Sequence, residues 1–83
     1  MNRIEQNKLL HDCLDQLGLE SLFVFKSEPN LLAIRVISKQ FRGLSRSERI
    51  DTVSKLISSN QNFASVYLEL ELFTPDEYFR VNI

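Results

Sequence analysis

The side chains that could carry binding chemistry concentrate in one basic run. The run consists of Lys39, Arg42, Arg46 and Arg49. It leads into a predicted helix, and the first turn of a helix exposes backbone N–H groups that favour anions. Guanidinium groups add paired hydrogen bonds to phosphates or carboxylates. The run therefore predicts a surface for nucleic acid or for an acidic protein. The competing interpretation is a solvated helix face, neutralised locally by Glu48 and Asp51.

The distribution of charge supports a distinct middle segment. The whole chain has a net charge of −1, which is no signature of nucleic-acid binding by itself. Residues 35–55 hold six basic and two acidic side chains, a net charge of +4. Residues 1–34 have a net charge of −2 and residues 56–83 a net charge of −3. A basic middle thus lies between two acidic ends.

Catalytic and metal chemistry have little support. Cys13 falls on the apolar side of a predicted helix, where a buried thiol is inert, and His11 falls on its solvated side. Two positions so spaced point to different sides of a helix, so they make no metal site. Glu69 and Glu71 share one face of a predicted strand near Arg35, which we interpret as a solvated surface. We expect no enzyme activity, no metal, no cofactor and no small-molecule substrate.

Length and composition predict one small domain over residues 1–83. A chain of 83 residues is too short to split into two cores, and its two Gly and two Pro argue against disorder. No apolar run reaches the roughly 20 residues that cross a bilayer. The single Cys suits a reducing compartment. We expect a cytoplasmic monomer.

The first half of the chain predicts a helix and a hairpin. Ile4, Leu10, Cys13, Leu14 and Leu17 recur at helical spacing over 2–17, with Asn2 as N-cap and Gly18 as a left-handed stop. The hairpin has strands over 21–26 and 31–38, joined by a turn at 27–30.

The second half predicts a helix, a strand and a short last helix. Gly43 permits a tight turn, after which Ser45 and Glu48 have the spacing of a capping box. The apolar stripe of that helix is Ile50, Val53, Leu56 and Ile57. Strict alternation over 65–73 predicts a strand, and Thr74 caps a last helix.

The elements predict an α+β fold in the order α-β-β-α-β-α. The strands on either side of the middle helix should lie parallel, and the hairpin adds an antiparallel strand. The result is a three-stranded mixed sheet with helices on one face. Its other face should carry Arg35, placed to pair with Glu69 or Glu71.

Three stretches in this order resemble the BolA-like family. They are VISKQFRGLSRSER (36–49), with Phe41, Gly43 and Ser45 in the motif, VSKLI (53–57) and LELELFTPDEY (68–78). The resemblance implies a fold similar to the type II KH domain. It also implies one of two roles: DNA-binding transcriptional regulation linked to stress, or partnership with a monothiol glutaredoxin around a shared [2Fe-2S] cluster.

The chain departs from the family at the positions that the resemblance assigns to cluster ligands. Ile50 and Val66 stand where members have His, and the turn SEPN (27–30) stands where they often have Cys or His. Neither Ile nor Val offers an electron pair to iron. The leading hypothesis is a regulatory domain that binds nucleic acid through residues 39–49. The alternative is a protein–protein adaptor for a monothiol glutaredoxin without cluster ligands of its own.

Overall fold

The computed structural model describes residues 3–81. Its main elements are α1 (Arg3–Cys13), β1 (Ser21–Glu28), β2 (Leu31–Ile37), α2 (Arg46–Ser58), β3 (Tyr67–Phe73) and α3 (Pro75–Val81). Short 3-10 turns lie at Asp15–Leu17, Lys39–Phe41 and Gln61–Phe63. The predicted order α-β-β-α-β-α and the α+β class are confirmed.

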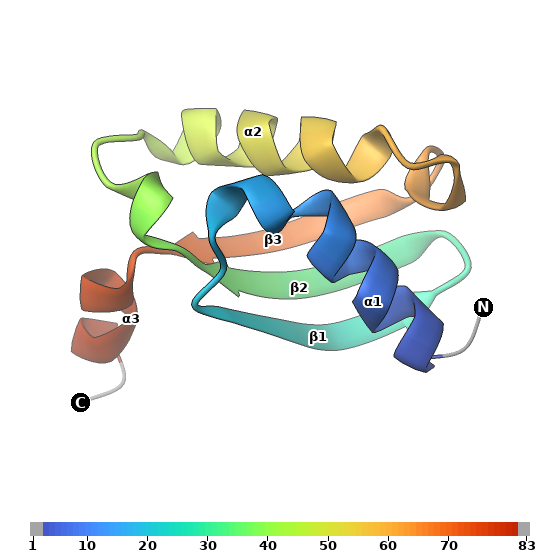
Figure 1. The fold of residues 1–83 in the computed structure, drawn as a ribbon, viewed down its shortest axis with the longest axis horizontal. Helices are drawn as coiled ribbons and strands as arrows, with labels where there is room; N and C mark the ends of the chain where they lie inside the picture. Colours follow the sequence, from blue (N-terminus) through green and yellow to red (C-terminus); the bar gives the residue numbers. More distant parts are fainter. Residues whose placement is uncertain (1–2, 82–83) are drawn as a thin grey trace.

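The sheet has the order β1-β2-β3, with β2 in the centre. β1 pairs with β2 antiparallel, because only Pro29 and Asn30 separate them, and β2 pairs with β3 parallel through the α2 crossover. α1 crosses in front of the sheet and α2 runs alongside β3, while α3 lies beyond the end of β3 (Figure 1). We call the side away from α1 and α2 the open face.

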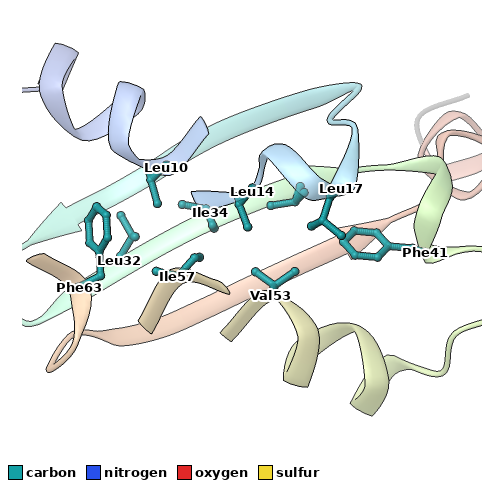
Figure 2. Close-up of a cluster of buried hydrophobic side chains, with 10 residues drawn as sticks. Leu10, Leu14, Leu17, Leu32, Ile34, Phe41, Val53, Ile57 and Phe63 are labelled. Carbon is teal, nitrogen blue, oxygen red and sulfur yellow. The ribbon is translucent and has the colours of Figure 1, made fainter. Parts of the chain in front are cut away.

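The core lies between β2 and the two long helices (Figure 2). β2 contributes Leu32, Ile34 and Val36, each at most 1% exposed. The facing residues are Leu10, Leu14, Leu17, Phe41, Val53, Ile57 and Phe63. β3 alternates between exposed residues and partly buried leucines, as its sequence predicts. This packing fixes which side of the sheet is left open.

The first helix departs from its predicted extent. α1 ends at Cys13, and the chain tightens into the 3-10 turn before Gly18 stops it at φ 54°. Placing Ile4 on the apolar stripe is wrong, because its side chain is 81% exposed. Six residues at about 100° each put Ile4 roughly 120° away from Leu10 around the helix. The predicted cap at Asn2 falls outside the described residues.

The predicted caps of the two later helices are confirmed. The Ser45 hydroxyl accepts the Glu48 amide at 3.2 Å, and the Glu48 carboxylate accepts the Ser45 amide at 2.9 Å. Thr74 and Glu77 repeat this reciprocal pair at 3.2 and 2.8 Å. Gly43 takes a φ of 78°, as a tight turn before α2 requires. Both helices therefore begin where their sequences predict.

A substitution at Ile57 tests the described core. Its side chain is fully buried, so Ile57→Ala should lower the free energy of unfolding by about 2–4 kcal/mol. Ile4→Ala removes the same atoms from an exposed site and should change it by less than about 0.5 kcal/mol. Urea unfolding followed by circular dichroism measures both. Equal losses in the two variants would contradict the described core.

Candidate functional site

The predicted basic run faces acidic residues from distant parts of the chain. Lys39 lies 3.7 Å from Glu20, between α1 and β1, and Arg42 lies 3.1 Å from Asp76 in α3. Both basic side chains remain more than half exposed, so each pair adds little to stability. Arg46 is exposed and has no ion pair within residues 3–81.

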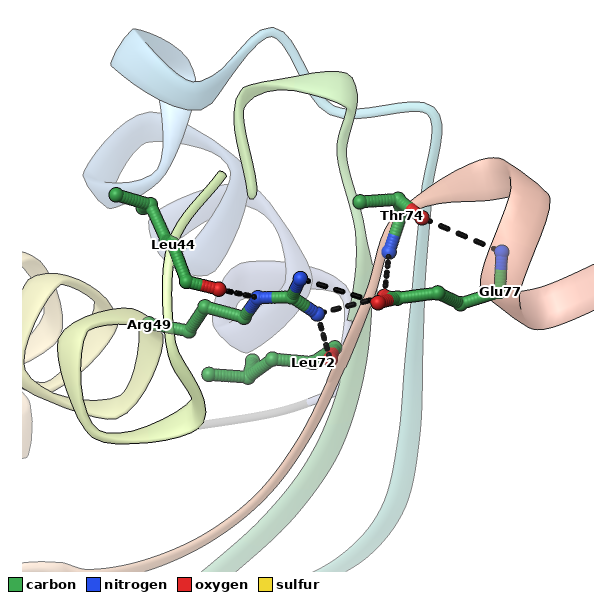
Figure 3. A network of polar contacts seen from close by, with 5 residues as sticks. All are labelled: Leu44, Arg49, Leu72, Thr74 and Glu77. Atoms are coloured by element: carbon green, nitrogen blue, oxygen red, sulfur yellow. Dashed lines mark hydrogen bonds and ion pairs between the residues drawn. The ribbon is translucent and has the colours of Figure 1, made fainter. Parts of the chain in front are cut away.

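Arg49 makes a denser set of contacts (Figure 3). Its Nε donates to the Leu44 carbonyl at 3.0 Å, and one terminal nitrogen donates to the Leu72 carbonyl at 3.2 Å. The two terminal nitrogens also bind the Glu77 carboxylate, at 2.6 and 3.1 Å. The side chain is 12% exposed. Arg49 thus joins the start of α2, the end of β3 and α3, and little of it is left to meet a ligand.

The same contacts set the charge state of Glu77. Hydrogen bonds from Arg49, and then the one from the Thr74 amide, lower the pKa of Glu77 from 4.5 to about 2. Its carboxylate caps α3 and pairs with Arg49 at once. Glu77 therefore stays ionised, and couples the position of α3 to that of α2.

The net charge of the basic middle is balanced by the fold. The segment 35–55 has a net charge of +4. Four acidic residues from outside it, Glu20, Glu71, Asp76 and Glu77, each pair with one of its basic side chains. The acidic ends of the sequence thus fold back onto the basic middle. Of the four basic-run residues, Arg46 is the one that lacks an ion pair in the described range.

Arg35 organises the open face. Its guanidinium lies 3.2 Å from Glu71, which confirms one of the two predicted pairings. The guanidinium carbon is 4.7 Å from the centre of the Phe25 ring and 5.4 Å from that of Tyr78. These distances are typical of cation–π contacts. The Arg35 Nε atom is buried and makes no hydrogen bond among the described residues.

An aromatic patch lies beside this arginine, which contacts two of its rings, and the sequence did not reveal the patch. It consists of Phe23, Phe25, Tyr78 and Phe79. The rings of Phe23 and Tyr78 stack with centres 6.4 Å apart, and the Phe79 ring lies 6.1 Å from Tyr78. Phe23, Phe25 and Phe79 are 40%, 55% and 65% exposed. Phe23 and Phe25 lie in the predicted strand over 21–26, but nothing local indicated that α3 folds beside them.

The three positions that stand where the resembled family has ligands do not form one group. Val66 lines a hollow of about 390 Å³ that the turn residues Ser27, Glu28 and Pro29 also line. Ile50 lines a different hollow, between α2 and β3. Among residues 3–81 no three His, Cys, Asp or Glu side chains lie close enough to share a metal. Without thiolate or imidazole, the donors around Val66 do not fit an iron–sulfur cluster.

Cys13 and His11 lie apart from these surfaces. Cys13 is partly buried, and burial raises the pKa of its thiol, which keeps it protonated and unreactive. His11 is exposed on α1. No helix within the described range has the length and apolar character to span a membrane.

The Glu77 carboxylate gives a pH-dependent test of the Arg49 network. Folding lowers the pKa of Glu77, so its contribution is present above about pH 5 and is lost as pH falls from 4.5 towards 2. Glu77→Gln should cost about 1–2 kcal/mol of unfolding free energy at neutral pH, a value discounted for partial exposure. The gap between wild type and variant should close towards pH 2.

Urea unfolding at several pH values measures this gap. Asp76→Asn is the matched control, because the Asp76–Arg42 pair is exposed on both sides, and it should change stability by less than about 0.5 kcal/mol. A gap for Glu77→Gln that is unchanged by pH would show that the carboxylate charge does not support the network.

Comparison with solved structures identifies the fold. No protein-family model and no curated protein matches the chain. Solved structures do: a bol-like protein from Babesia bovis has a TM-score of 0.73 at 17% identity, covering 92% of both chains. The BolA domain of SufE1 from Arabidopsis thaliana has a TM-score of 0.71 at 17% identity, covering 93% of this chain and 98% of that one. BolA1 from Arabidopsis thaliana has a TM-score of 0.69 at 19% identity, covering 93% and 96%. The chain therefore has the BolA-like fold.

Proposed function

We propose that this chain is a non-enzymatic protein-binding domain that docks its partner on the aromatic patch of the open face. The observation that carries the proposal is the exposure of Phe23, Phe25 and Phe79 in one patch that the ion-paired Arg35 contacts. Aromatic residues and Arg are enriched in protein interfaces, and contiguous exposed apolar surface marks such sites. Tyr78 and Arg35 hold the rings in place, which lowers the entropic cost of docking.

A monothiol glutaredoxin is the partner that the BolA-like fold favours. In this chain Ile50 and Val66 offer no lone pairs, so it would dock the glutaredoxin and leave cluster ligation to the partner. One of the similar structures is a BolA domain within SufE1, which is compatible with a binding module. The proposed role is that of an adaptor.

The adaptor proposal predicts the effect of removing exposed rings. Phe25→Ser and Phe79→Ser should each weaken binding to a monothiol glutaredoxin about tenfold or more, as loss of a central aromatic contact does. The control is Ile4→Ser, which removes an apolar side chain that is 81% exposed elsewhere. Isothermal titration calorimetry measures all three affinities. If neither Phe variant binds more weakly than Ile4→Ser, the patch is not the docking surface.

The visible spectrum separates docking from ligation. With a cluster-loaded glutaredoxin, the complex should absorb as the glutaredoxin does alone. A changed spectrum would mean that this chain supplies a ligand, against the donor argument at Ile50 and Val66.

Nucleic-acid binding through Lys39, Arg42, Arg46 and Arg49 is the second candidate. Lys39 and Arg42 stay 65% and 57% exposed within their ion pairs. Exposed pairs are weak, so phosphates could displace the carboxylates. Arg46 needs no displacement, because it has no ion pair within the described residues. Arg49 is the least available of the four.

Duplex and single-stranded DNA titrations test this candidate. Binding should appear at about 50 mM salt and weaken steeply as salt rises, because each phosphate contact releases counterions. Arg42→Ala with Arg46→Ala should lower the salt slope by about two units. Lys55→Ala is the control, since its exposed cation lies outside the run. Absent binding, or binding unchanged by the double variant, would remove nucleic acid as a ligand.

A further inference from the structure

β3 presents an unpaired backbone edge. It pairs with β2 on one side only. The Tyr67 amide donates to the Asn30 carbonyl, and the Phe73 carbonyl accepts from the Ser38 amide. The backbone N–H and C=O groups of the odd-numbered residues of β3 therefore point towards β2. The backbone N–H and C=O groups of successive residues in a strand point in alternate directions. Those of the even-numbered residues therefore point away from β2, as the hydrogen bond from Arg49 to the Leu72 carbonyl confirms. Because β3 is an edge strand, the outward backbone groups of Leu68 and Leu70 have no neighbouring strand to pair with among residues 3–81.

A groove runs beside this edge. Its volume is about 670 Å³, the size of a site for several side chains. β3 contributes Leu70, Glu71, Leu72 and Phe73, while the segment around the start of α2 contributes Leu44, Arg46, Arg49 and Ile50. The leucines and Ile50 make much of the lining apolar, and the Arg49–Glu77 pair lies at the α3 end. The groove therefore combines apolar contact with backbone groups that seek partners.

The groove is lined by two arginines and two glutamates, so its formal charges balance, but one of the arginines is unpaired within residues 3–81. Arg49 pairs with Glu77, and Glu71 pairs with Arg35 on the open face. Arg46, the first residue of α2, has no ion pair among the described residues and stands at the helix end that favours anions. A single carboxylate on an occupant would pair with Arg46.

We propose that this groove binds an extended, mainly apolar segment of a protein partner, carrying one carboxylate, by strand addition to β3. The segment's backbone would pair with the outward N–H and C=O groups of Leu68 and Leu70. One aliphatic side chain would rest on Ile50 and Leu70, and an Asp or Glu would reach Arg46. The groove borders the aromatic patch at Glu71 and Phe73 but is lined by none of the four patch residues, so the inference does not depend on the proposed adaptor function.

The edge chemistry favours a peptide over two other occupants. A strand edge alternates donors and acceptors, which match another backbone and do not match a row of phosphates. The lining residues Glu71 and Glu77 would repel a row of phosphates, whereas a segment with one carboxylate can place it at Arg46, away from them. A second copy of this chain, paired edge to edge through β3, would bring the rows of Glu69 and Glu71 together, and like charges across strands destabilise pairing.

The test uses a soluble eight-residue peptide with alternating valines and one Asp, titrated into isotope-labelled protein and followed by amide NMR. We expect saturable shifts at Leu68, Leu70 and Leu72, and slower amide hydrogen exchange at Leu68 and Leu70. Ile50→Glu should weaken binding about tenfold or more, because it places a charge on the apolar lining. Lys55→Glu is the control, since it reverses an exposed charge on the same helix outside the groove.

A charge exchange makes the test specific. Arg46→Glu should weaken binding of the Asp peptide about tenfold, and a peptide with Lys in place of Asp should show the opposite preference. A peptide methylated on alternate backbone nitrogens should not bind. Four outcomes would overturn the proposal: shifts confined to other surfaces, unaltered binding of the methylated peptide, no preference reversal with Arg46→Glu, or a DNA oligonucleotide or second copy of the chain occupying the groove in preference to the peptide.

Discussion

The bidentate contact between Arg49 and Glu77 is the interaction on which the arrangement of the elements depends. It closes a network that also holds the carbonyls of Leu44 and Leu72. α3 has seven residues, too few to be stable as an isolated helix. Its position is therefore set by its contacts, which join the Glu77 carboxylate to Arg49 and the Tyr78 ring to Phe23 and Phe73. Tyr78 and Phe79 directly follow Glu77 in α3. The position of these two patch residues therefore depends on Arg49, which is not itself part of the patch.

Basic side chains of the middle segment form ion pairs with acidic residues of the same chain, so their charge is partly neutralised before any ligand binds. In sequence the basic middle looks like a binding segment, since it concentrates cations over 21 residues. In the structure Glu20, Glu71, Asp76 and Glu77 reach it from outside. The surface pairs contribute little stability, but they lower the potential that a phosphate backbone would meet. Exposed aromatic rings are consequently the stronger functional signal.

Local chemistry made much of the fold predictable. The two capping boxes, the glycine at 43 and the alternation over 65–73 depend on neighbours within a few residues, and the structure confirms them. Ile4 was misplaced because a loose apolar stripe spans more than one side of a helix. The partners of Arg42 and Arg49 lie 34 and 28 residues away, and no local pattern distinguishes Glu77 from the other carboxylates. For the same reason the patch was missed, because its rings come from both ends of the chain.

Glu71 explains how one strand can serve two surfaces. Its carboxylate points to the open face and holds Arg35 beneath Phe25 and Tyr78, while its residue also lines the groove beside α2. Together with Glu69 it gives the edge of β3 a negative row, a charge pattern that discourages pairing between copies of a chain. The edge of β3 is thus open to an added strand but disfavours pairing with a second copy of the chain. A strand added there must tolerate these carboxylates on one side and satisfy Arg46 on the other, and this pair of constraints selects the occupant by its charge pattern.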